Sequence, residues 1–135
     1  MEKKFLDIPA YITSEKLESY FEEFLNYYEN CYYNIDEILE ELVELSEIQW
    51  NTHELISKPL KNKLENYLFK IIDLDSYPIM DLIFIIIGRL GLENIYLWII
   101  ENKKSIKNIE VIKDIEEIEK EYGYSYVDPY SNYWG

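Results

Sequence analysis

The stretch PIMDLIFIIIGRLG, residues 78–91, decides how this chain folds, because as a helix it would be apolar on nearly every side. A helix without a polar face belongs in the middle of a fold, where no side of it meets water. The preceding SYP, residues 76–78, is a typical helix start, since proline is tolerated in the first turn. Gly91 suits the position just after a helix, where a left-handed conformation is common. We therefore predict one central helix here.

Apolar residues recur at helical spacing along most of the chain, and Gly and Pro are scarce, with four of each. We predict an all-α fold: a compact bundle or a short α-solenoid of about six helices in a single domain, residues 1–135. Residues 1–13 are expected to form an extended N-terminal segment. Residues 122–135 are expected to form an irregular tyrosine-rich tail, which either lies over the bundle or forms an ordered contact surface.

Helix starts are predicted from side chains that can cap a first turn. Ser14, Ser57 and Ser105 are N-cap candidates, and Asn34 with Glu37 three residues later resembles a capping box. The helices predicted around the central one cover, in round terms, about residues 14–28, 34–48, 57–73, 92–102 and 106–121.

The composition indicates a folded protein despite a formal net charge of -14, since 48% of the residues are apolar and 16% are aromatic. Cys31 is the only cysteine, which fits a reducing compartment and allows no internal disulfide. The start MEKKFLDIPAY has no apolar segment of signal-peptide length. The longest apolar run, residues 82–87, is far short of the ~20 residues that cross a bilayer. We expect a cytoplasmic protein without a membrane partner.

Acidic residues are distributed unevenly. No Lys or Arg lies between Leu17 and Ser57, while residues 15–54 hold twelve acids and one lysine. On the predicted second helix, like charges three or four residues apart repel by about 0.2 to 0.5 kcal/mol per pair. This face either binds a basic partner or is a solvated face screened by salt, and the absence of interleaved lysines favours binding. The charge repels phosphates, so we expect no direct nucleic-acid ligand.

The expected partner is a basic protein, because opposite fields accelerate an encounter and tyrosines supply contact area at interfaces. The candidate partner-binding residues are Tyr32, Tyr33, Asp36, Glu37, Glu40, Glu41, Glu44, Glu47, Trp50, His53 and Glu54.

Motifs for catalysis or metal binding are missing from the sequence. Cys31 and His53 are the only residues that could form a Cys–His pair, and neither has a recognisable nucleophile setting. His53 lacks the second histidine, four residues on, of a zinc protease helix. The stretch from Asp73 begins like a calcium loop, but Pro78 stands where a glycine is needed and Phe84 where a glutamate is needed. We expect no enzyme, no cofactor and no metal.

Two short patterns resemble known helical proteins. IIIGRLGLENIYLWII, residues 85–100, resembles the helix–turn–helix unit of HEAT-like repeats, and Trp50, His53 and Glu54 resemble a W-x-x-H-E pattern of small HEAT-like immunity proteins of bacterial toxin systems. The resemblance implies an inhibitor that binds a toxin domain. In the alternative interpretation, Trp50 fills a helix junction and His53 hydrogen-bonds a nearby carbonyl or carboxylate.

The favoured functional hypothesis is an immunity or antitoxin-type inhibitor of a cognate basic toxin, most naturally a nuclease, whose phosphate site the acids would imitate. A phage-type DNA-mimic anti-defence protein is an alternative that uses the same charges on another target. The third hypothesis is a soluble helical scaffold or interaction module, or a small helical enzyme.

Overall fold

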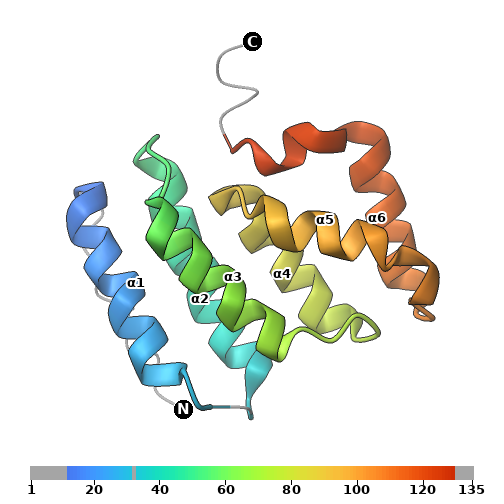
Figure 1. Cartoon of the computed structure of the whole chain (residues 1–135), viewed down its shortest axis with the longest axis horizontal. Coiled ribbons are helices and arrows are strands. Elements are labelled where there is room, and N and C mark those ends of the chain that lie inside the picture. The colour runs from blue at the N-terminus through green and yellow to red at the C-terminus, as the bar shows by residue number, and fades with distance from the viewer. Residues whose placement is uncertain (1–11, 32, 130–135) are drawn as a thin grey trace.

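The computed structural model describes residues 12–31 and 33–129, and every regular element within them is helical (Figure 1). The all-α prediction is therefore confirmed. The elements in chain order are α1 (Ser14–Tyr28), α2 (Ile35–Asn51), α3 (Lys58–Ile71), α4 (Tyr77–Leu90), α5 (Glu93–Glu101), the 3-10 helix η1 (Lys103–Ser105), α6 (Ile109–Glu121) and the 3-10 helix η2 (Gly123–Val127). The predicted N-terminal segment lies outside the described residues as far as residue 11.

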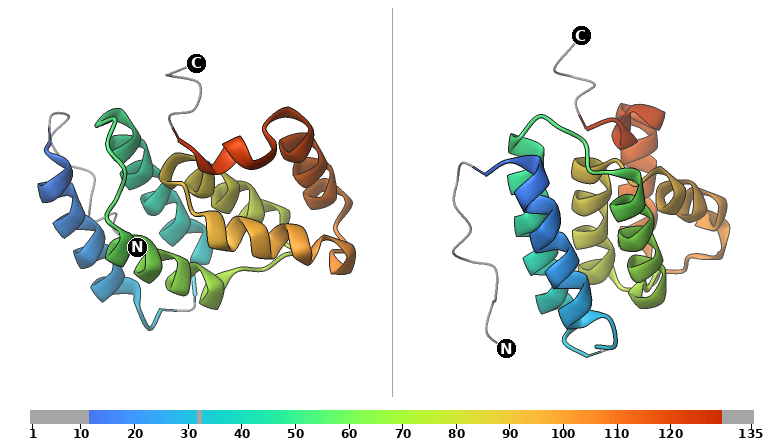
Figure 2. Two further views of the ribbon diagram at one scale, coloured as in Figure 1. Left: turned by 45° about the horizontal axis from the view of Figure 1, so that its top comes forward. Right: turned by 60° about the vertical axis from the view of Figure 1, so that its left-hand side comes forward.

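The six α-helices form two rows, which the views of Figures 1 and 2 show from three sides. In one row α1 contacts α3 and α3 contacts α5, and in the other α2 contacts α4 and α4 contacts α6. The helices thus pack mainly within these two rows, and α1 with α2 and α4 with α5 make contacts between the rows, as in a compact helical bundle. Helices packed in two rows occur in unrelated proteins, so this arrangement does not assign the chain to a family.

The apolar helix α4 lies at the centre of these contacts, as its sequence predicts. It touches α2, α5, α6 and η2, and its contact with α2 is the most extensive between any two described elements. Met80, Ile83, Ile86 and Ile87 are completely buried on it. Each such side chain contributes roughly 1.5 to 3 kcal/mol relative to an exposed one, so α4 stabilises the row of α2, α4 and α6.

Three of the predicted helix boundaries are confirmed. The hydroxyls of Ser57 and Ser76 accept hydrogen bonds from the first turns of α3 and α4, and a proline follows each serine within two residues. Gly91 ends α4 with a φ of 69°, in the left-handed region. These signals are local, because the capping side chain, the proline and the glycine act on the turn in which they stand.

Three other predicted caps differ from the structure, although α1 and α2 begin within one residue of the predicted positions. Thr13, and not Ser14, caps α1, because the hydroxyl of Ser14 instead accepts a hydrogen bond from Gln49. Asn34 precedes α2 in a left-handed conformation and makes no side-chain cap. Asn108 caps α6 in place of Ser105, since residues 103–105 form η1 and the chain is extended at residue 106 before it turns into the helix.

The start of the predicted irregular tail is also corrected, because residues 123–127 form the short helix η2. The segment of residues 123–129, which we call the strap, lies over the helices. The Tyr126 hydroxyl donates a hydrogen bond to the carbonyl of Phe84 on α4. The indole Nε1 of Trp50 donates to the carbonyl of Pro129 over 3.0 Å. Of the two alternatives for the tail, the described part lies over the fold, and residues 130–135 fall outside the described residues.

Among the described residues, every helix is too short or too polar to cross a membrane.

Candidate functional site

The exposed face of α2 is acidic, as the sequence predicts. Asp36, Glu37, Glu40 and Glu47 are exposed and Glu44 is half-buried. An α-helix turns by about 100° per residue, so Asp36, Glu40 and Glu47 point in directions that differ by only about 40° around the axis. We call these three residues the acidic row. They run along most of the length of α2.

Glu41 does not belong to this face, although it was among the candidate partner-binding residues. It is only 2% exposed, and its carboxylate accepts a hydrogen bond of 2.6 Å from the hydroxyl of Tyr28 on α1. Burial, together with this hydrogen bond, raises the pKa of Tyr28 above its usual range. Glu41 therefore joins two helices from inside the fold.

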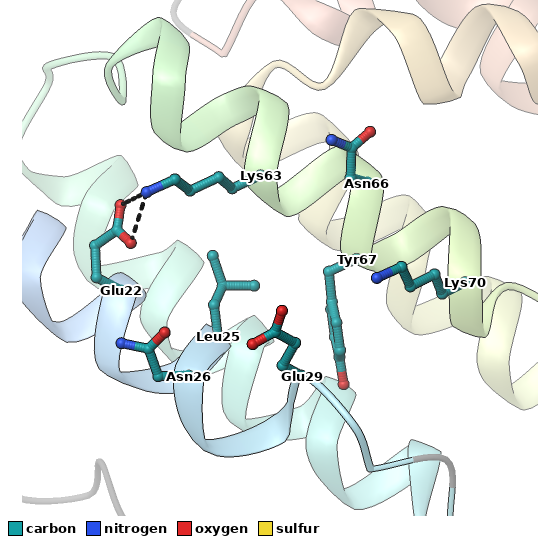
Figure 3. A pocket seen from close by; sticks show the side chains of 8 residues that line it. All are labelled: Glu22, Leu25, Asn26, Glu29, Lys63, Asn66, Tyr67 and Lys70. Carbon is teal, nitrogen blue, oxygen red and sulfur yellow. Dashed lines mark hydrogen bonds and ion pairs between the residues drawn. The ribbon is translucent and has the colours of Figure 1, made fainter.

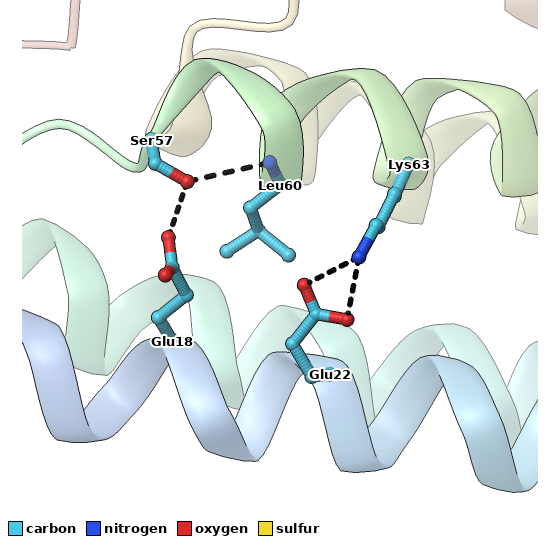
Figure 4. A network of polar contacts seen from close by, with 5 residues as sticks. All are labelled: Glu18, Glu22, Ser57, Leu60 and Lys63. Carbon is cyan, nitrogen blue, oxygen red and sulfur yellow. Dashed lines mark hydrogen bonds and ion pairs between the residues drawn. The ribbon is translucent and has the colours of Figure 1, made fainter.

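The acids of α1 have a different role from those of α2. Glu22 forms an ion pair with Lys63 of α3, and the hydroxyl of Ser57, at the start of α3, donates a hydrogen bond to Glu18 (Figure 4). The acid-rich sequence of residues 15–54 is thus divided in space, because α1 directs two of its acids toward α3.

The acidic row, in contrast, has no ion-pair partner among the residues that the structure describes. Three carboxylates that point the same way, with no ion-pair partner in residues 12–31 and 33–129, give the described part of this face a negative field. Such a field attracts a basic partner from a distance and is weakened by salt.

A shallow pocket of about 310 Å³ lies between α1 and α3, and the sequence analysis did not predict it. Figure 3 shows Lys63 and Lys70 on the α3 side and Glu22, Asn26 and Glu29 on the α1 side. The bidentate pair of Lys63 and Glu22 closes one end. Charges of both signs line the pocket, so it lacks the single sign that distinguishes the face of α2.

A groove of about 480 Å³ lies at the junction of α1 and α2. It is lined by Tyr27, Tyr28, Cys31, Tyr33 and Asn34, and we call it the tyrosine groove. Tyr33, a candidate from the sequence, is 70% exposed, and Tyr27, which was not a candidate, is 55% exposed. The candidate Tyr32 lies outside the described residues. A run of tyrosines at a helix end was the only signal for this groove.

The other end of α2 has a structural role. Gln49 is buried and its amide donates to the Ser14 hydroxyl over 3.1 Å and to the carbonyl of Glu54 over 2.7 Å. Half-buried Trp50 is bonded to the strap. The arrangement of Trp50 agrees with the alternative in which it fills a helix junction.

His53 and Glu54, the last two candidates, lie in the turn after α2 and are exposed. His53 has a φ of 59°, which is unusual for a residue other than glycine. It is not the buried histidine of the alternative interpretation. Cys31 precedes α2 and His53 follows it, and a helix of 17 residues is about 25 Å long. The structure therefore keeps the two side chains of the only possible Cys–His pair apart.

The calcium-like stretch also has a structural explanation. The carboxylate of Asp75 accepts hydrogen bonds from the backbone N–H groups of Lys107 and Asn108, over 2.7 and 3.1 Å. These bonds lower the pKa of Asp75. Asp75 thus joins the loop after α3 to the start of α6. Within the described residues, no group of three or more His, Cys, Asp or Glu side chains is placed to hold a metal ion.

A second acidic cluster lies on α4 and α6 and was not predicted. Burial and the nearby charges of Asp81, Glu117 and Glu110 raise the pKa of Asp114.

Comparison of the chain with models of protein families, with curated proteins and with solved structures found no match.

Proposed function

We propose that this protein is an immunity or antitoxin-type inhibitor that binds a basic toxin protein through the acidic row of α2 and acts in the cytoplasm. The observation that carries the proposal is the row itself: Asp36, Glu40 and Glu47 are exposed, point the same way and have no ion-pair partner among the described residues. The proposal assigns binding to this surface and no catalysis.

The row fits a toxin that acts on nucleic acid. A nuclease must attract phosphates, so its substrate site is basic, and carboxylates on one helix face present the same sign of charge as phosphates to that site. Opposite fields would speed the encounter of inhibitor and toxin, which matters for an inhibitor that must act before its target does. The W-x-x-H-E resemblance points to the same class of protein.

Co-expression with the protein encoded beside its gene tests the proposal. We expect rescue of growth and a complex on a sizing column that weakens as salt is raised. The variant Glu40→Lys with Glu47→Lys is expected to lose both. The matched control is Glu110→Lys with Glu117→Lys, which changes the net charge equally at the same spacing on the exposed surface of α6.

Absence of both rescue and complex would contradict the immunity assignment. If the protein instead displaced duplex DNA from a restriction enzyme, the DNA-mimic alternative would be indicated, since it uses the same row on another target.

A further inference from the structure

The tyrosine groove combines three features that the proposed function leaves unused. It has a volume of about 480 Å³, two of its rings are more than half exposed, and it opens beside the first turn of α2. An exposed tyrosine ring offers a large contact area that a partner could cover, and tyrosine is enriched at protein–protein interfaces. The groove is therefore a candidate for the place where one side chain of a partner is inserted.

The charged residues that the structure describes in the first turn of α2, beside the groove, are acidic. Asp36 and Glu37 stand exposed in the first turn of α2, directly after Asn34 at the groove. Glu37 lies one turn before Glu41, whose carboxylate is bonded to the groove residue Tyr28. None of the described lining residues is basic, and the sequence has no Lys or Arg between residues 17 and 57. Such surroundings favour a cation and repel an anion.

The rings select the kind of cation. A positive group over a tyrosine face is attracted by the negative face of the ring, and a guanidinium group can also stack its plane on that face. The hydrogen bond to Glu41 holds the Tyr28 ring in one orientation, and Tyr27 packs edge-on against that ring with 4.8 Å between the centroids. The Tyr28 side of the groove is thus held in place before a ligand arrives, and the exposed Tyr27 ring packs against it.

We propose that the tyrosine groove takes an arginine side chain of the toxin, with its guanidinium group against the tyrosine rings and the acids of the first turn of α2 facing its charge. This inference rests on the proposed function, because the arginine belongs to the partner. It adds a specific anchor to a surface that otherwise attracts by charge alone.

Titration of the full-length protein with ethylguanidinium, followed by NMR, tests the groove without the partner. We expect saturable shifts of the backbone amides of Cys31, Tyr33 and Asn34. Ethylurea has the same shape without the charge and is expected to leave these amides unchanged. The variants Tyr27→Leu and Tyr33→Leu are each expected to weaken binding about three-fold, the size of an exposed cation–π contact.

The control variant is Tyr77→Leu, which removes an exposed tyrosine that lies near the acids Asp81 and Asp114 but outside the groove. It is expected to bind ethylguanidinium as the unmodified protein does. Equal shifts with ethylurea would overturn the inference. So would shifts confined to the acids of residues 36–47, or binding that the Tyr27 and Tyr33 variants leave unaltered.

Failure of this inference can be told from failure of the proposed function. If the toxin complex is lost in Glu40→Lys with Glu47→Lys but persists unchanged in Tyr27→Leu with Tyr33→Leu, the arginine anchor is wrong and the acidic row stands. If ethylguanidinium binds in the groove but reversal of the row leaves the complex intact, the row is wrong and the guanidinium chemistry of the groove stands.

Discussion

The hydroxyl of Tyr28 donates a hydrogen bond of 2.6 Å to the carboxylate of Glu41, and both side chains are buried. This contact joins the end of α1 to the middle of α2. The acids of α2 therefore differ in exposure, since Glu41 is buried at this contact while the neighbouring Glu40 is exposed. The pair of Tyr28 and Glu41 thus holds one wall of the tyrosine groove in place.

Removal of the Tyr28 hydroxyl is expected to destabilise the fold. Tyr28→Phe takes one donor away from a buried carboxylate, which costs about 1 to 3 kcal/mol of unfolding free energy. Urea unfolding measures the loss. The control is Tyr33→Phe, at an exposed ring, which is expected to change the unfolding free energy by less than about 0.5 kcal/mol. Equal effects of the two substitutions would mean that the hydrogen bond contributes nothing.

Stability is expected to fall in alkali. Burial raises the pKa of Tyr28 and of Tyr126 above the usual value of 10.0. The folded state then holds these protons more tightly than the unfolded state. The resulting stabilisation is fully present below about pH 10 and is lost as the pH rises above it, by about 1.4 kcal/mol per pH unit for each tyrosine. Urea unfolding at several pH values is expected to give a shallower alkaline slope for Tyr28→Phe, and an unchanged slope would contradict this account.

The contact with the strap makes Gly91 more important for stability than Gly123. Gly91 and Gly123 both have positive φ, 69° and 54°. A Cβ at Gly91 would lie 2.9 Å from the carbonyl oxygen of Val127 and 3.1 Å from the ring of Pro129, whereas a Cβ at Gly123 would meet nothing within 4 Å.

Both alanine variants therefore carry the strain of the left-handed conformation, and Gly91→Ala also disturbs the strap. We expect Gly91→Ala to cost about 1 to 3 kcal/mol more than Gly123→Ala in urea unfolding. It should also speed hydrogen exchange at the amide of Asp128, which donates to Ser125. Equal stability of the two variants would show that the strap does not depend on Gly91.

The buried Glu65 of α3 is predicted to act as a cap for another helix. Its carboxylate accepts hydrogen bonds from the backbone N–H of Ile95 over 2.9 Å and from the Asn94 side chain over 3.2 Å, in the first turn of α5. Glu65→Ala is expected to cost about 1 to 3 kcal/mol, because it leaves the Ile95 N–H buried without this acceptor. Exposed Glu101→Ala is the control, and an equal effect in thermal unfolding would refute the capping role.

The helices and those helix boundaries that depend on local signals could be predicted from the sequence. The hydrophobic spacing found the helices, and Ser57, Ser76 and Gly91 marked their ends because each acts within one turn. One of the wrong caps has a tertiary cause. Ser14 looks like a cap in isolation, but its hydroxyl is bonded to Gln49, which lies 35 residues away in the chain.

The candidate site was predictable only in part, for a similar reason. Helical spacing placed Asp36, Glu40 and Glu47 on one face without further information. The same spacing puts Glu41 about 100 to 140° away from these three acids. Its hydrogen bond to Tyr28, on another helix, shows that it points into the fold. The role of Trp50 was equally hidden, since the carbonyl it binds is that of Pro129, in the distant strap.

The association rate of inhibitor and toxin, measured by stopped flow over a range of salt concentrations, tests the central claim most directly. For the unmodified protein we expect a rate that falls at least about ten-fold as the field of the acidic row is screened. Glu40→Lys with Glu47→Lys is expected to associate slowly at low salt and to respond little to added salt. Glu110→Lys with Glu117→Lys is expected to keep most of the salt dependence. Equal salt dependence in the two variants, or a loss of affinity that salt does not affect, would contradict binding through the acidic row.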